Sequence, residues 1–126
     1  AVAGGAVFFE KRKNHRWVGI AGGLSVGVPP PATAALVRAL AVRGDAYEAQ
    51  LGVGACQVVV DGAADVARVR AIATGLGGHA WVADGPDALR EDPWGPAPGG
   101  LDVMRRLKAA FDPAGILSPG IGVGRI

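Results

Sequence analysis

Apolar and polar residues alternate in the first half of the chain with the period of a β-strand. The alternation is clearest over residues 47–53, and residues 56–60 form a second run rich in β-branched side chains. Gly52-Val53-Gly54 stands where the two runs meet and predicts a hairpin turn. An earlier strand is expected at one of two places, 17–20 or 24–28. The pattern therefore predicts three strands in this part of the chain.

Two further stretches place apolar residues three and four positions apart, which is the period of a helix that buries one face. The first follows the prolines at 29–31, which suit a first helical turn, and ends at Gly44. The second has Asp65 in its first turn and ends near Gly77. The two apolar faces consist of Leu36, Val37 and Leu40, and of Val66, Val69, Ala73 and Leu76. A last short strand is expected at 79–83.

A third helical pattern lies near the end of the chain and is amphipathic. Its apolar stripe consists of Leu101, Met104, Leu107 and Phe111. Asp112-Pro113 ends the helix, because the proline ring disfavours helical geometry in the residue before it. A second turn is expected at 118–120, followed by an extended tail. We expect the stripe to pack on the domain's own sheet.

The order of elements predicts the fold class. It runs strand, helix, strand, strand, helix, strand, followed by a long loop and the C-terminal helix. This is the order of an α+β, ferredoxin-like split β-α-β fold, with an antiparallel sheet, two helices on one face, a C-terminal helix and an extended tail. Such a fold does not by itself indicate a function.

Composition narrows the class of protein. With 126 residues, 50% hydrophobic and 19% charged, the chain suits one compact domain. No long uncharged apolar stretch predicts a membrane span. Cys56 is the single cysteine, so no internal disulfide can form. The net charge of +2 is too small to indicate nucleic acid as a partner.

Few residues of the sequence are candidates for catalysis or ligand binding by themselves. His15 and His79 are isolated, and Cys56 alternates onto the same face as Val58, so it is expected to be a buried, inert thiol. No metal site is expected, and no catalytic residue can be named. The basic run at 10–16 is interpreted as a solvated linker, with phosphate binding as the alternative.

One run of residues near the C-terminus resembles a known family. It consists of Met104-Arg105-Arg106-Leu107-Lys108-Ala109-Ala110-Phe111-Asp112-Pro113-Ala114-Gly115-Ile116-Leu117-Ser118-Pro119-Gly120. This run resembles the closing segment of FAD-linked oxidases of the vanillyl-alcohol oxidase superfamily. Asp92-Pro93-Trp94-Gly95-Pro96 further resembles the FAD-binding subunit of glycolate oxidase. Ser118 departs from the family, which usually has asparagine at this position.

The extent of the resemblance sets the expected domain boundaries. It is specific over 92–120, extends less strongly back to residue 17, and is absent before that. Residues 1–16 are therefore expected to be a linker or a segment foreign to the family, and 17–126 the C-terminal cap domain. The domain that holds the flavin in this family is expected upstream of the sequence given.

The resemblance implies a function for the complete enzyme. It implies FAD-dependent oxidation of a small 2-hydroxy acid such as glycolate, with FAD held mainly by the upstream FAD-binding domain. The residues expected to approach the cofactor domain are Ser118, Pro119, Gly120, Lys108 and Arg105. Other oxidase subunits are implied as partners, and nucleic acid is not. The implied location is the cytoplasm, with peripheral attachment to the inner membrane through partner subunits.

Residues 50–57 depart from the catalytic relatives in this family. Those relatives carry a sequence rich in histidine and asparagine around the two hairpin glycines, whereas this chain keeps Gly52 and Gly54 and has no histidine there. The isolated chain is therefore expected to be inactive. The alternative is a stand-alone ferredoxin-like module that is regulatory or binds nucleic acid. The expected strands lack the paired aromatic residues with which such modules stack bases.

Overall fold

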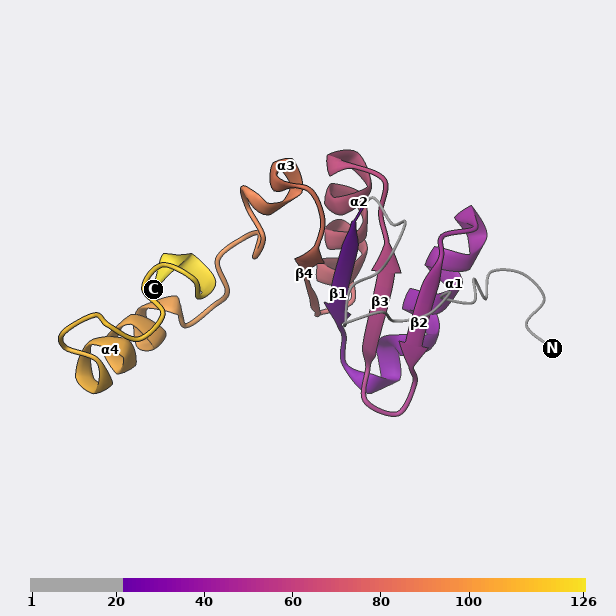
Figure 1. The fold of residues 1–126 in the computed structure, drawn as a ribbon. Helices are drawn as coiled ribbons and strands as arrows, with labels where there is room; N and C mark the ends of the chain where they lie inside the picture. Colours follow the sequence, from indigo (N-terminus) through magenta and orange to yellow (C-terminus); the bar gives the residue numbers. More distant parts are fainter. Residues whose placement is uncertain (1–21) are drawn as a thin grey trace. The chain divides into compact units, whose positions relative to one another are not determined.

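The computed structural model of the protein describes residues 22–126. The expected linker at 1–16 and the alternative strand at 17–20 lie outside the described residues. The chain forms two compact units, of which the first ends at Pro93 and the second spans Trp94–Ile126. The first unit contains the sheet, and the second contains the C-terminal helix (Figure 1).

The first unit is a four-stranded antiparallel sheet with helices inserted between its strands. Its main elements are β1 (Gly23–Gly27), α1 (Thr33–Arg43), β2 (Tyr47–Gln50), β3 (Ala55–Val59), α2 (Ala63–Gly75) and β4 (His79–Asp84). The strands lie in the order β2-β3-β1-β4, and every neighbouring pair is antiparallel. This order and connectivity confirm the predicted α+β fold and are those of a ferredoxin-like sheet.

The ends of α1 follow from its sequence. Three prolines precede it, and Pro30–Ala32 forms a short 3-10 turn that leads into the helix. Thr33 Oγ1 donates a hydrogen bond of 2.8 Å to the carbonyl oxygen of Pro30. Gly44 follows the last turn with φ of 76°, in the left-handed region that glycine adopts without steric cost. The predicted helix and its glycine stop are confirmed.

The predicted hairpin between β2 and β3 is confirmed, and one of its glycines cannot be replaced without strain. Gly54 has φ of +74°, and a Cβ atom built there would lie 2.0 Å from the carbonyl oxygen of Val28. Val28 N donates a hydrogen bond of 2.9 Å to the carbonyl oxygen of Gly54, which ties the turn to the end of β1. The strand before the turn is shorter than its alternation predicted, because the chain turns after Gln50 and leaves Leu51 exposed.

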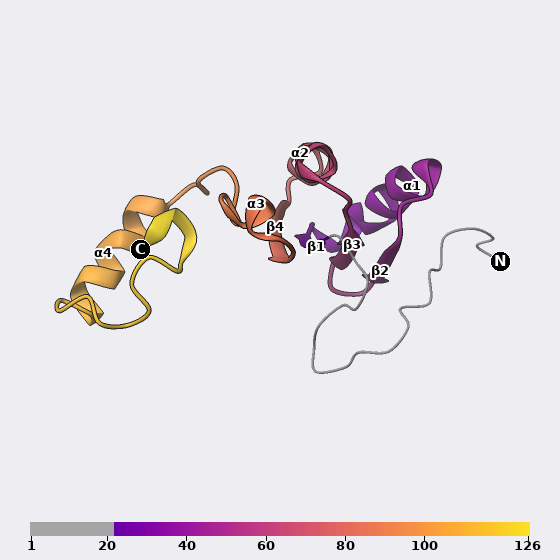
Figure 2. The ribbon, with the colours of Figure 1, turned by 45° about the horizontal axis from the view of Figure 1, so that its top comes forward.

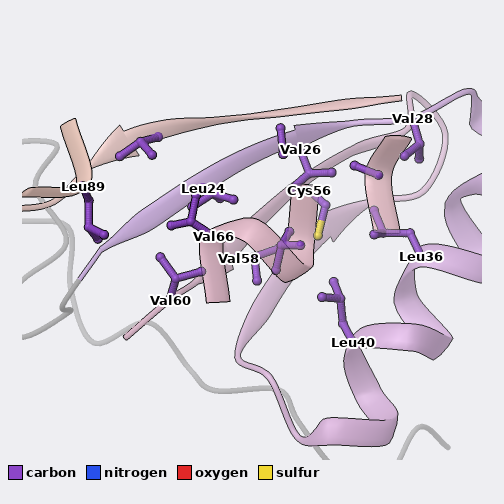
Figure 3. Close-up of a cluster of buried hydrophobic side chains, with 14 residues drawn as sticks. Leu24, Val26, Val28, Leu36, Leu40, Cys56, Val58, Val60, Val66 and Leu89 are labelled. Atoms are coloured by element: carbon purple, nitrogen blue, oxygen red, sulfur yellow. The ribbon is translucent and has the colours of Figure 1, made fainter. Parts of the chain in front are cut away.

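The hydrophobic core lies between one face of the sheet and the two long helices. Figure 2 shows α1 and α2 on the same side of the sheet, and Figure 3 shows Leu36, Leu40 and Val66 directed towards the strands. The strand residues of the core are Leu24, Val26, Cys56, Val58, Ala80 and Val82. Their alternation along each strand leaves the intervening residues on the opposite face of the sheet.

A short helix, α3 (Asp87–Arg90), occupies a region for which only a loop was predicted. Leu89 projects from it into the core. A Cβ atom built on Gly22 would lie 2.7 Å from Leu89 Cδ1, so glycine is needed where this leucine packs. Four residues are too few to give a helical period in the sequence, which is why α3 was missed.

The second unit contains α4 (Leu101–Phe111) and ends in a 3-10 turn, Val123–Arg125. The predicted helix is present, and the second unit leaves most of its apolar stripe uncovered. Leu107 is 54% exposed and Phe111 is 81% exposed. The periodicity of the sequence identified the apolar face of α4 correctly, but it does not indicate which surface covers that face. Phe111 therefore does not belong to a core formed within the second unit.

The first prediction compares two neighbouring apolar residues of α1. Replacing Leu40, which is fully buried, with alanine should lower the free energy of unfolding by about 2 to 5 kcal/mol, because it removes apolar contacts and leaves a cavity. The matched control is Val42→Ala in the same helix, where the side chain is 88% exposed and the change should stay within about 0.5 kcal/mol. Urea unfolding followed by circular dichroism measures both. Equal effects would contradict the assignment of the core to this face.

Candidate functional site

The five residues that the sequence singled out all lie in the second unit. Arg105 and Lys108 are on α4, and Ser118, Pro119 and Gly120 follow in the turn after the helix. The structure links helix and turn through Asp112, a residue that the sequence analysis treated only as the end of the helix.

Asp112 joins the end of α4 to the following turn through both of its carboxylate oxygens. Oδ1 accepts a hydrogen bond of 2.9 Å from Ile116 N, and Oδ2 accepts one of 2.9 Å from Leu117 N. The Asp112 side chain is only 3% exposed. One buried carboxylate therefore satisfies two backbone donors that would otherwise have no partner in this turn.

Lys108 completes this cluster from one turn earlier in the helix. Its Nζ lies 2.8 Å from Asp112 Oδ2 and also donates a hydrogen bond to the carbonyl oxygen of Leu117. The charge of Lys108 is thus neutralised within the unit. We call Lys108, Asp112 and the backbone of Ile116 and Leu117 the Asp112 cluster.

The Asp112 cluster favours the ionised carboxylate. The hydrogen bond from Lys108, followed by that from Leu117 N, lowers the pKa of Asp112 to about 2. Asp112 is therefore an anion at neutral pH and has no capacity to act as a general base there, since a base must take up a proton near the working pH.

Ser118 has an unusual backbone conformation directly after the cluster. Its φ is +45°, in the left-handed region that side chains other than asparagine and glycine seldom adopt. Gly120 follows with φ of +74°. The asparagine that the resembled family has at the position of Ser118 suits this conformation better than serine does.

Arg105 differs from the other cations of α4 in its surroundings. Lys108 is engaged in the Asp112 cluster, and Arg106 lies 3.7 Å from Asp102 across one helical turn. Arg105 is exposed on the helix surface. It is therefore the cation of this helix best suited to meet an acidic or phosphate group of another domain.

Two contacts close the second unit on itself. Trp94 Nε1 donates a hydrogen bond of 2.9 Å to the carbonyl oxygen of Ile121. A Cβ atom built on Gly124 would lie 2.7 Å from Leu101 Cδ1, so the end of the chain approaches the start of α4 closely. The tail is therefore turned back rather than extended throughout.

Three groups of the second unit that could hold a phosphate are already engaged within the Asp112 cluster. A pyrophosphate needs converging backbone N–H groups or unpaired cations. In this unit the Lys108 cation already faces a carboxylate, and the N–H groups of Ile116 and Leu117 already donate to Asp112. These three groups are therefore not available to a phosphate in this structure.

Two other residues considered for chemistry, Cys56 and His79, lie close to other residues of the sheet unit. Cys56 is buried, and its burial followed by the charge of Glu48 raises the pKa of its thiol to about 12. The predicted inert thiol is thus confirmed. His79 lies over Gly27, where a built Cβ would approach the ring to 2.8 Å. His15 lies outside the described residues.

The last two features of residues 22–126 concern metal binding and membrane crossing. Within that range no group of three or more His, Cys, Asp or Glu side chains is placed to hold a metal ion. Over the same residues, no helix has the length and apolar character needed to cross a membrane.

The second prediction concerns the pH dependence of the turn. The pKa of Asp112 in the folded chain lies below the ordinary value of 3.8, so the cluster stabilises the turn above about pH 4 and loses this contribution as the pH falls towards 2. Amide exchange at Ile116 and Leu117 should become faster over that window, relative to other exposed amides. In Asp112→Asn the two amides should exchange faster at neutral pH, and the step below pH 4 should vanish. An unchanged step in this variant would show that another group causes it.

The third prediction concerns the left-handed residue. Ser118→Asn or Ser118→Gly should relieve backbone strain of about 1 kcal/mol, because both residues adopt positive φ more readily than serine. The readout is the exchange rate of the Ile121 amide, whose N–H donates to the Ser118 carbonyl oxygen at 3.3 Å. Ser118→Val is the matched control and should speed this exchange, since β-branched residues resist positive φ. Equal rates in all three variants would contradict the assigned conformation.

The comparisons with known proteins concern this same segment. Residues 94–121 match the family model described as FAD linked oxidases, C-terminal domain. Searches of curated proteins and of solved structures each gave no match. The matched residues lie within the second unit and include α4, the Asp112 cluster and the turn at 118–120. This segment is thus similar to the C-terminal domain of FAD linked oxidases, and the sheet of the first unit is compatible with a cap domain of that kind.

Proposed function

We propose that this chain is the C-terminal cap domain of an FAD-dependent oxidoreductase and works together with an upstream FAD-binding domain. The observation that carries the proposal is the family match over 94–121, which covers a segment with a defined internal structure. The ferredoxin-like sheet of the first unit supports it, because such a sheet is compatible with a cap domain.

The finer proposal is that the complete enzyme resembles glycolate oxidase and oxidises a small 2-hydroxy acid. Its support is the resemblance of Asp92-Pro93-Trp94-Gly95-Pro96 to the FAD-binding subunit of that enzyme. The same resemblance supports association with other oxidase subunits, in the cytoplasm or at the inner membrane through those subunits.

Within this proposal the turn at 118–120 and Arg105 contact the FAD-binding domain. Ser118, Pro119 and Gly120 are exposed and follow directly from the Asp112 cluster, which fixes where the turn begins. Arg105 offers an exposed cation. Lys108 acts indirectly, because its amine holds Asp112 and the Leu117 carbonyl oxygen. It therefore positions the turn rather than touching the cofactor.

The exposed stripe of α4 also supports docking on another domain. The segment Trp94–Ile126 buries little apolar surface of its own, and the stripe residues Leu107 and Phe111 are exposed. In the complete enzyme, an apolar surface on the FAD-binding domain would cover this stripe. The basic side chain of Arg105 at the edge of the stripe favours an acidic rim on that surface.

The fourth prediction tests this function with the chain as it stands. The purified chain should be colourless and should bind added FAD weakly or not at all, because FAD is expected to be held mainly by the upstream domain and the Asp112 cluster already engages Lys108 and the N–H groups of Ile116 and Leu117. Addition of the FAD-binding domain of a glycolate oxidase FAD-binding subunit should give a complex in which glycolate bleaches the visible flavin absorbance. Gel filtration and anaerobic absorbance spectra measure the two steps.

Matched variants separate a specific contact from a loss of folding. Arg105→Ala should weaken the complex, whereas Arg38→Ala, at an exposed arginine of α1, should not. A yellow preparation with about one FAD per chain would contradict the expectation that the chain by itself does not hold FAD. Failure to bind any FAD-binding domain, together with binding of RNA or a small regulatory ligand, would instead favour the stand-alone module.

A further inference from the structure

β4 is an edge strand of the sheet, and its outer side is covered by the chain itself. β1 lies on one side of β4, and no other strand of the described sheet lies on the other side. There, Val82 N donates a hydrogen bond of 2.7 Å to the carbonyl oxygen of Pro93, the last residue of the first unit. The chain thus returns to the edge of β4 just before the second unit begins.

Arg70, on α2, holds this returning segment in place. Its Nη2 donates to the carbonyl oxygens of Asp92 at 2.6 Å and Pro93 at 3.1 Å. Its Nε lies 3.4 Å from the carbonyl oxygen of Ala80, on β4. One guanidinium therefore contacts both the edge strand and the segment that covers it.

The contacts to backbone carbonyls matter more than the ion pair that accompanies them. Arg70 Nη1 also lies 3.1 Å from Asp92 Oδ2, but the Asp92 side chain is 68% exposed, and exposed ion pairs contribute little. The Arg70 side chain is only 16% exposed, and its hydrogen bonds to the carbonyl oxygens of Ala80 and Pro93 are partly buried. A planar guanidinium can donate to several carbonyls at once, which the single amine of lysine cannot reproduce.

We infer that Arg70 is a positioning residue: it fixes Asp92-Pro93 along the outer edge of β4 and so sets the point at which residues 94–126 leave the sheet. The same contacts close that edge to pairing with another strand. Proline suits position 93, because it offers the carbonyl that Val82 and Arg70 require and has no N–H group that could continue a sheet.

This role gives a physical reason for part of the Asp92-Pro93-Trp94-Gly95-Pro96 motif. It bears on the proposed function only because the segment that begins directly after Pro93 is the one that matches the oxidase family. The contacts lie within the first unit, so they can be tested without any flavin domain. Failure of the proposed function would leave this inference standing, and failure of the inference would leave the family match unchanged.

The fifth prediction uses hydrogen exchange at single amides of the whole chain. In Arg70→Gln the Val82 amide should exchange about tenfold faster or more, relative to Val28 and Val60, whose N–H groups bond to other residues inside the sheet unit. Arg70→Lys should give an intermediate increase, because one amine can still reach a single carbonyl. Both replacements keep part of the aliphatic stem that packs on the sheet, which favours folding.

Two controls and a second measurement make the result decisive. Asp92→Asn should change the relative rate at Val82 by less than about twofold, since its exposed carboxylate contributes little. Arg68→Gln, on the same helix, removes the pair with Asp45 and should leave Val82 unchanged relative to Val28 and Val60. Trypsin should cleave after the exposed Arg90 faster in Arg70→Gln than in the unchanged chain.

Three outcomes would overturn the inference. The first is an unchanged relative rate at Val82 in both Arg70 variants. The second is an equal acceleration at Val82, Val28 and Val60, which would give Arg70 only a general role in stability. The third is an effect of Asp92→Asn as large as that of Arg70→Gln, which would assign the contact to the ion pair.

Discussion

The alternation of apolar and polar residues along β1, β3 and β4 is the constraint on which the sheet unit depends. It places Leu24, Val58 and Val82 on one face and leaves their neighbours on the other. Both long helices must then cover the same face, because only that face is apolar. The split β-α-β connection satisfies this requirement with short turns, among them the Gly54 hairpin and the turn at Gly44.

The second unit follows a different physical principle. Its order depends on polar contacts within the Asp112 cluster and on the return of its end towards Leu101, rather than on a core of its own. A carboxylate that satisfies two backbone N–H groups and a lysine amine can define a turn precisely without burying apolar surface. Such a segment has a fixed local shape, and its apolar stripe remains available for contact.

Sequence reasoning predicted the sheet unit well, because its signals are periodic and local. Prolines before Thr33, glycines at Gly44 and Gly54, and the spacing of Leu36 and Leu40 each specify one element. The sequence did not reveal that Asp112 joins Lys108 to the turn, since its apparent role was only to precede a proline. It also could not reveal the contact of Arg70 with Pro93, because hydrogen bonds between residues far apart in the chain leave no periodic pattern.

The partner of the α4 stripe could not be identified from the sequence for a related reason. An amphipathic pattern shows that one face of a helix avoids water, but the partner of that face is set by tertiary structure. Here the stripe is exposed, and the described sheet unit has its core filled by α1 and α2. Among the expected cofactor residues, the structure explains how Lys108 and Ser118 shape the turn, while their relation to a flavin domain stays a proposal.

The distribution of buried residues has a consequence for how variants of this protein should be screened. Within residues 22–126, every buried hydrophobic side chain lies between Leu24 and Leu89. A thermal melting curve therefore reports mainly on the sheet unit. A substitution that disrupts the fold of residues 94–126 would leave the melting curve nearly unchanged. Only probes placed within that segment would detect the change.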